Sequence, residues 1–126
     1  MGSMDSKKKI IAVDDNVENL TALKNTLKNS YDAYPCPSAL KMFDILKHIQ
    51  PDLILLDVEM PEMNGYEAAE KLKSDDKYRE IPIMFLTSMN DEESKKKGLS
   101  LGAVDFINKP FDTTSLLQRL ETHLSS

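Results

Sequence analysis

The feature of this 126-residue chain that most restricts its fold is a fivefold alternation of short apolar runs with segments of helical periodicity. Short apolar runs bounded by turn residues are typical of strands that are buried on both faces of a parallel sheet. Alternation of this kind predicts βαβ units with right-handed crossovers, and therefore one α/β domain with a five-stranded parallel sheet. The predicted strands lie at residues 10–13, 31–36, 53–57, 81–86 and 103–107.

The second run differs from the others because it is polar and contains Pro35. A residue without an N–H group is least costly at the edge of a sheet, so this strand is expected at an edge. The first and third runs are very apolar and are expected at the centre. The predicted order is therefore 2-1-3-4-5, a doubly wound, flavodoxin-like (βα)5 fold whose strand order reverses between the first and third strands.

Composition and charge exclude several classes of protein. No apolar stretch reaches the roughly 20 residues of a membrane-spanning helix, and a net charge of −5 argues against a nucleic-acid-binding surface. Cys36 is the only cysteine, so an intrachain disulfide cannot form and a reducing, cytoplasmic location is expected. Residues 1–6 are expected to be a disordered remnant of cloning, with one domain over residues 7–126.

Charged side chains follow three of the predicted strands. Asp14 and Asp15 end the first run, Asp57 ends the third, and Lys109 follows the fifth. Because open parallel sheets bind ligands at the carboxyl ends of strands near the reversal of strand order, these side chains are expected to converge. Three close carboxylates repel one another, and a hard divalent cation, Mg²⁺ or Mn²⁺, relieves that repulsion. With Lys109 the formal charge of the pocket reaches zero, which allows a phosphoryl group to enter.

The residues of this pocket suit different tasks. Asp57 stands alone at its strand end and is predicted to be a nucleophile that forms an aspartyl phosphate, whereas Asp14 and Asp15 suit metal binding. Thr87 ends the fourth strand and offers a hydroxyl group to a phosphoryl oxygen. Taken singly, each residue has a plainer interpretation, since acids after strands commonly cap helices or begin turns. Only their joint order and spacing indicate a site for phosphoryl transfer.

Four segments together resemble the receiver domain of two-component response regulators, over about residues 8–124. They are residues 13–16 (VDDN), 56–65 (LDVEMPEMNG), 86–88 (LTS) and 102–111 (GAVDFINKPF). The resemblance implies that Asp57 accepts a phosphoryl group from a phosphohistidine of a sensor histidine kinase or a histidine phosphotransfer protein. It implies a signalling domain rather than an enzyme, apart from its own phosphorylation and slow dephosphorylation.

The resemblance also implies how the cation is bound. Asp15, Asp57 and the backbone carbonyl of Glu59 would ligate Mg²⁺ directly, and Asp14 would act through water. Glu59 and Met89 occupy positions that tune the hydrolysis of the phosphoryl group, in a direction that the sequence leaves open.

A conformational switch is implied as well. Lys109 would hold a phosphoryl oxygen, and its peptide bond to Pro110 would be cis. Thr87 would move toward the phosphoryl group and Phe106 would change rotamer, so that the surface of the fourth helix, fifth strand and fifth helix changes. Phe106 stands where tyrosine is commoner in the family, so any contact through a tyrosine hydroxyl is absent.

Two other functions are known for α/β folds with acids or phosphate loops after the first strand, and the sequence fits them less well. A phosphohydrolase of haloacid dehalogenase type needs two aspartates separated by one residue on the first strand, whereas Asp14 and Asp15 are adjacent. A flavin-binding electron carrier needs a phosphate loop rich in Ser, Thr and Gly at that place. An effector domain or output partner and a phosphorylation-dependent homodimer stay open. His48 and His123 lie on helical segments and are expected to be solvated.

Overall fold

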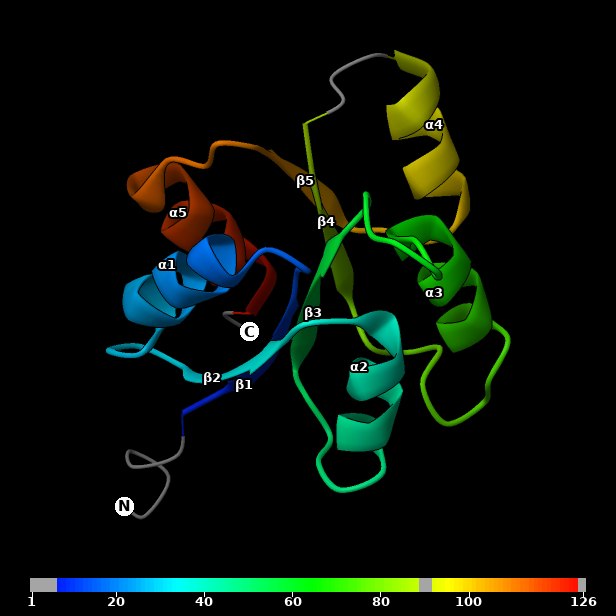
Figure 1. Ribbon diagram of the computed structural model, residues 1–126, viewed down its shortest axis with the longest axis horizontal. Coiled ribbons are helices and arrows are strands. Elements are labelled where there is room, and N and C mark those ends of the chain that lie inside the picture. The colour runs from blue at the N-terminus through cyan, green and yellow to red at the C-terminus, as the bar shows by residue number, and fades with distance from the viewer. Residues whose placement is uncertain (1–6, 89–91, 125–126) are drawn as a thin grey trace.

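The computed structural model describes residues 7–88 and 92–124, and within these ranges five strands form one sheet of order β2-β1-β3-β4-β5 (Figure 1). All neighbouring strands are parallel, which confirms the predicted fold class. The expected disorder of residues 1–6 and the position of Met89 lie outside the described residues. The strands are β1 (Lys9–Val13), β2 (Asp32–Cys36), β3 (Leu53–Asp57), β4 (Ile83–Thr87) and β5 (Asp105–Asn108). The helices are α1 (Val17–Leu27), α2 (Ala39–Leu46), α3 (Gly65–Lys73), α4 (Glu92–Ser100) and α5 (Thr113–Leu124).

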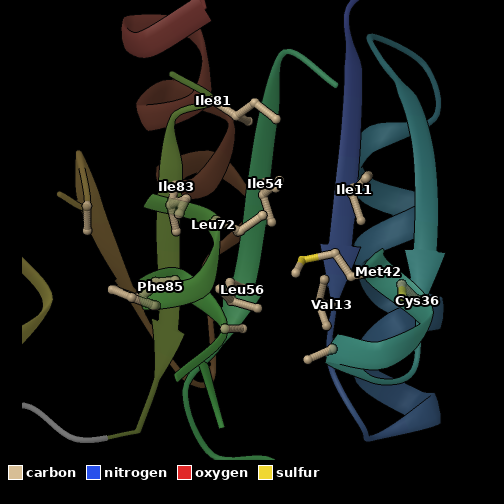
Figure 2. Close-up of a cluster of buried hydrophobic side chains, with 14 of the residues drawn as sticks. Ile11, Val13, Cys36, Met42, Ile54, Leu56, Leu72, Ile81, Ile83 and Phe85 are labelled. Carbon is tan, nitrogen blue, oxygen red and sulfur yellow. The ribbon is translucent and has the colours of Figure 1, made fainter. Parts of the chain in front are cut away.

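Helices cover both faces of the sheet, α1 and α5 on one side and α2, α3 and α4 on the other (Figure 1). Successive residues of a strand point to opposite faces. Leu53 and Leu55 of β3 therefore join the apolar cluster of α1 and α5, and Ile54 and Leu56 join that of α2 and α3. Figure 2 shows the second cluster, with Met42 of α2 and Leu72 of α3 among the labelled side chains. Two apolar layers thus fix the central strands whose ends carry the acids.

β2 lies at an edge of the sheet, as its polar residues predicted. The N–H of Asp32 donates to Lys8 O on the β1 side at 2.9 Å. Because N–H groups alternate in direction along a strand, those of positions 33 and 35 point away from the sheet. Pro35 therefore occupies a position where no ladder hydrogen bond is lost.

β4 and β5 each begin two residues later than predicted. β4 begins at Ile83 rather than at Ile81, because Pro82 has no N–H and Ile81 N–H donates to Tyr78 O at 3.0 Å in a turn. β5 begins at Asp105, two residues late, because the N–H of Ala103 donates to Gly98 O at the end of α4.

None of the helices in the described part of the chain combines the length and hydropathy that crossing a bilayer requires.

The start of α3 is fixed by a capping box. Asn64 is the N-cap and Gly65 the first helical residue. Asn64 Oδ1 accepts a hydrogen bond from Glu67 N, and Glu67 Oε1 accepts one from Asn64 N, both at 2.9 Å. This capping box starts the helix immediately after the loop that follows Asp57.

Candidate functional site

Three carboxylates gather at the carboxyl ends of the two central strands. Oxygen atoms of Asp14, Asp15 and Asp57 lie within 4.8 Å of one another. β1 and β3 are neighbours with Val13 opposite Leu56, so the parallel register carries the acids that follow these residues to the same edge. The predicted convergence is therefore present at the point where the strand order reverses.

Lys109 joins the two acids that are buried. Asp14 and Asp57 are 0% exposed, whereas Asp15 is exposed. Lys109 Nζ lies 2.8 Å from Asp57 Oδ1 and 3.0 Å from Asp14 Oδ2. The backbone of Lys109 is fixed because its N–H donates to Thr87 O at 2.9 Å, and its peptide bond to Pro110 is cis, as the resemblance implied. One ammonium group thus serves two buried carboxylates.

Asp14 is held rigidly by its own neighbourhood. Its Oδ1 accepts a hydrogen bond from Asn16 N at 2.9 Å, and its Oδ2 accepts one from Asn19 Nδ2 at 3.2 Å. Asn16 is the N-cap of α1, since its Oδ1 accepts a hydrogen bond from Asn19 N at 3.0 Å. Sequence reasoning missed Asn19. Its signal is its place three residues beyond the cap, in the first turn of a helix that begins beside the strand end.

Asp57 has one bound and one unbound oxygen. Its Oδ1 accepts a hydrogen bond from Lys109 Nζ and another, at 3.4 Å, from the N–H of Glu59. Its Oδ2 is buried without a hydrogen-bond partner among the described residues. Burial raises the pKa of Asp57 to about 6, the charge of Asp14 adds to this, and Lys109 opposes it.

Lys109 keeps its charge in this setting. Burial works to lower the pKa of its ammonium group, but the hydrogen bonds and charges of Asp57 and Asp14 outweigh burial and raise that pKa. The two buried acids and Lys109 together leave one uncompensated negative charge, and the exposed Asp15 adds a second. The pocket is therefore short of positive charge by two units.

This donor set fits a hard divalent cation. Carboxylate oxygens are preferred ligands of Mg²⁺ and Mn²⁺, and the unpartnered Oδ2 of Asp57 is an oxygen that a cation would satisfy. The cluster of Asp14, Asp15 and Asp57 offers at least one oxygen from each residue. The deficit of two positive charges equals the charge of such an ion.

Three further features lie close to the ends of β3 and β4. Glu59 Oε1 accepts a hydrogen bond from Ser88 Oγ at 2.6 Å, which links the residues that follow β3 and β4. Sequence reasoning missed Ser88, because its partner lies in a different loop. Thr87 is almost completely buried at the end of β4. Gly65 is required by close approach, since a Cβ there would lie 2.3 Å from the backbone oxygen of Asp57.

Phe106 lies away from the acids. It faces Phe85 across the β4–β5 pair, with ring centroids 6.0 Å apart, and it is only partly buried. His123 was expected to be solvated; it is partly buried, and its Nε2 lies 3.0 Å from Oδ2 of Asp105, the first residue of β5. His48 is exposed, as expected.

Comparison with known proteins identifies the family. The model of the response regulator receiver domain matches residues 10–121. The chemotaxis protein CheY4 of Vibrio cholerae is 28% identical, with a TM-score of 0.90, over 94% of this chain and 100% of that chain. The signal receiver domain of a signal transduction histidine kinase from Syntrophus aciditrophicus is 33% identical, with a TM-score of 0.84, over 94% of this chain and 90% of that chain.

A curated relative from Vibrio cholerae serotype O1, named a probable cyclic di-GMP phosphodiesterase, is 36% identical over 117 residues. The match spans 93% of this chain but only 26% of that longer protein, so it gives no evidence for an enzymatic activity of this chain. The fold, the acidic pocket and the family match lead to one conclusion: the chain belongs to the response regulator receiver domain family.

Proposed function

We propose that this chain is a phosphoacceptor signalling domain of a two-component phosphorelay and that Asp57 receives the phosphoryl group. The observation that carries the proposal is the environment of Asp57, a fully buried carboxylate with one oxygen on Lys109 and the other unpartnered. The haloacid dehalogenase and flavin alternatives have no support in the family match.

The transfer is an in-line displacement at phosphorus. A carboxylate oxygen of Asp57 forms the new O–P bond while the P–N bond of the donor phosphohistidine breaks. The electron pair of the broken bond stays with the imidazole nitrogen, and the donor leaves as neutral imidazole if its other nitrogen carries a proton. With a pKa of about 6, Asp57 is mostly ionised at neutral pH and is ready to attack.

The side chains of the pocket compensate the charge that arrives. Lys109 Nζ already lies 2.8 Å from Asp57 Oδ1, so it is placed to donate to an oxygen of the attached phosphoryl group. Thr87 would offer its hydroxyl to another oxygen. Mg²⁺ or Mn²⁺, held by Asp14, Asp15, Asp57 and the backbone carbonyl of Glu59, would offset the remaining negative charge.

The partners follow from this chemistry. The donor is a sensor histidine kinase or a histidine phosphotransfer protein, and the readout is the surface of α4, β5 and α5, which Thr87 and Phe106 would change. An effector domain or a second copy of the chain are the candidate receivers of that signal. Glu59, held by Ser88, and Met89 would set the lifetime of the phosphoryl group.

The deciding experiment is labelling by acetyl phosphate with Mg²⁺, read by intact-protein mass spectrometry. We expect one acid-stable, base-labile phosphoryl group on the wild type and none on Asp57→Asn. Asp105→Asn is the control, because Asp105 is likewise an acid paired with basic side chains, Arg119 and His123, although it is only partly buried. Equal labelling of the wild type and Asp57→Asn would refute the assignment.

A second experiment separates transfer from switching. Lys109→Ala is expected to be phosphorylated more slowly and to signal poorly, because the ammonium group no longer binds the acyl phosphate. Lys73→Ala is the control, since Lys73 is also partly buried but donates to the backbone oxygens of Arg79 and Ile81 at 3.0 and 3.3 Å. Full activation of Lys109→Ala would contradict the proposed role.

A further inference from the structure

Gly98 is an unusual residue to find at the contact between α4 and the rest of the molecule. It is the only buried residue within the described helix Glu92–Ser100. A glycine inside a helix is less favourable than alanine, and its backbone here does not adopt a positive φ that would require glycine. The reason for glycine at this position must therefore lie in packing.

The ring of Phe106 occupies the place of the missing side chain. A Cβ on Gly98 would lie 2.6 Å from both Cε2 and Cζ of Phe106 and 3.1 Å from Cδ2 of Phe85. The first distance is shorter than any real carbon contact allows. The Phe106 ring as it lies, against α4 and Phe85, leaves no room for a Cβ at position 98, so a side chain there requires the end of the ring to move.

Hydrogen bonds and ion pairs hold the backbone on both sides of this ring. The N–H of Phe106 donates to Asp105 Oδ1 at 2.8 Å, and the Asp105 carboxylate is held by Arg119 and His123 of α5. On the other side, Tyr66 of α3 holds α4, because its Oη donates to Ser94 O at 3.2 Å. A Cβ at position 98 would therefore displace the end of the Phe106 side chain before it displaced either backbone.

We propose that Gly98 is a positioning residue that makes the inward position of the Phe106 ring available, and that a Cβ at this position restricts the ring to an outward one. A phosphoryl group can shift a population only between conformations that exist. On this proposal, replacing Gly98 removes the inward conformation of the Phe106 ring, so that only the outward one is left. This inference rests on the proposed function only where it links the ring to the phosphorylation of Asp57.

The first test needs no phosphorylation. Gly98→Ala is placed in the wild type and in Phe106→Ala, and the urea midpoint of unfolding is measured for each. We expect the substitution to raise the midpoint in the Phe106→Ala background, where the ring is gone, and to lower it or leave it unchanged in the wild type. Ser100→Ala, at an exposed position of the same helix, is expected to shift both midpoints equally. The same increase for Gly98→Ala in both backgrounds would overturn the proposal.

The second test follows the ring. Protein containing fluorinated phenylalanine gives one ¹⁹F resonance for each of the four phenylalanines, and loss of a signal in Phe106→Leu assigns that of Phe106. In the wild type, acetyl phosphate with Mg²⁺ is expected to shift the Phe106 resonance. In Gly98→Ala the resonance starts at a different position and is expected not to move, although mass spectrometry shows that Asp57 is labelled.

A shift of equal size in wild type and Gly98→Ala would refute the role of Gly98. If the wild type itself shows no label on Asp57, the proposed function fails, and the unfolding measurements still decide whether Gly98 and Phe106 are coupled. The two failures are therefore distinguishable.

Discussion

Two kinds of side chain are equally well buried in this molecule, and they affect its stability in opposite ways. Leu55 in the middle of β3 and Asp57 at its end are both 0% exposed. Burial of an apolar side chain stabilises a fold by roughly 1.5–3 kcal/mol, whereas burial of a carboxylate without full compensation costs free energy. One five-residue strand thus contributes both to the core and to the site. The comparison indicates that the core stabilises the protein and that the site is maintained at the expense of that stability.

The largest expected effect tests the apolar half of this comparison. Leu55→Ala removes a completely buried side chain between the sheet and the α1–α5 layer. We expect a loss of about 2–5 kcal/mol in the free energy of unfolding, from lost burial and the cavity that remains. Urea denaturation followed by circular dichroism measures it. A loss below about 1 kcal/mol would mean that the layer rearranges to fill the space.

The polar half of the comparison, Asp57, predicts an effect on the free energy of unfolding that is opposite in sign to that of Leu55→Ala. Burial raises the pKa of Asp57 from its ordinary value of 3.8 to about 6, so the stability linked to its neutral form is complete below pH 3.8 and is lost as the pH rises through about 6. Asp57→Asn has no such titration. Without divalent metal, we therefore expect the stability of Asp57→Asn relative to the wild type to increase by about 2–3 kcal/mol between pH 4 and pH 7.5.

The control for this comparison is Asp76→Asn, because Asp76 is an exposed acid on the same protein, paired only with Arg79. Its stability relative to the wild type is expected to change little over the same pH range. A constant difference between Asp57→Asn and the wild type at all pH values would show that Asp57 is not strained by its burial.

A cation bound to the acidic site should offset part of the free energy that burial of its carboxylates costs. Binding to the folded state stabilises by mass action, by about 1.4 kcal/mol when Mg²⁺ is at ten times its dissociation constant. We expect this gain in the wild type and its loss in Asp15→Ala, a substitution at an exposed position. Thermal denaturation with MgCl₂, compared with NaCl at equal ionic strength, measures it. The assigned ligands would be wrong if Asp15→Ala gained as much as the wild type.

The smallest effect is expected where a leucine is not buried. Leu99 of α4 is 57% exposed, whereas Leu120 of α5, the helix on the opposite face of the sheet, is completely buried. Leu99→Ala should change the free energy of unfolding by less than about 0.5 kcal/mol, and Leu120→Ala should cost several times more. Parallel urea titrations of the two variants measure the ratio. Equal losses would show that α4 is packed more tightly than its single buried residue indicates.

Sequence patterns could predict the sheet because its rules are local. Alternation of apolar runs, together with a proline in the second run, was enough for the strand order, and parallel strands bring their carboxyl ends together whatever the details. The convergence of Asp14, Asp57 and Lys109 follows from that order alone.

The contacts that sequence reasoning missed depend on how separate loops approach one another. Ser88 and Glu59 are 29 residues apart, and no periodicity relates them. The pairing of His123 with Asp105 depends on how α5 lies along β5. The role of Gly98 is visible only when the ring that fills its place is located. The predicted starts of β4 and β5, at residues 81 and 103, were too early because neighbouring turns use the N–H groups of those residues.

Pro35 has a consequence beyond the placing of β2. An outer strand with a complete row of outward N–H groups is a template on which a further chain can continue the sheet. Here one of the outward positions carries a pyrrolidine ring and no donor, so the hydrogen-bonding pattern that an incoming strand needs is interrupted. A second molecule that added a strand along this edge would therefore form at least one backbone hydrogen bond fewer than an uninterrupted edge allows.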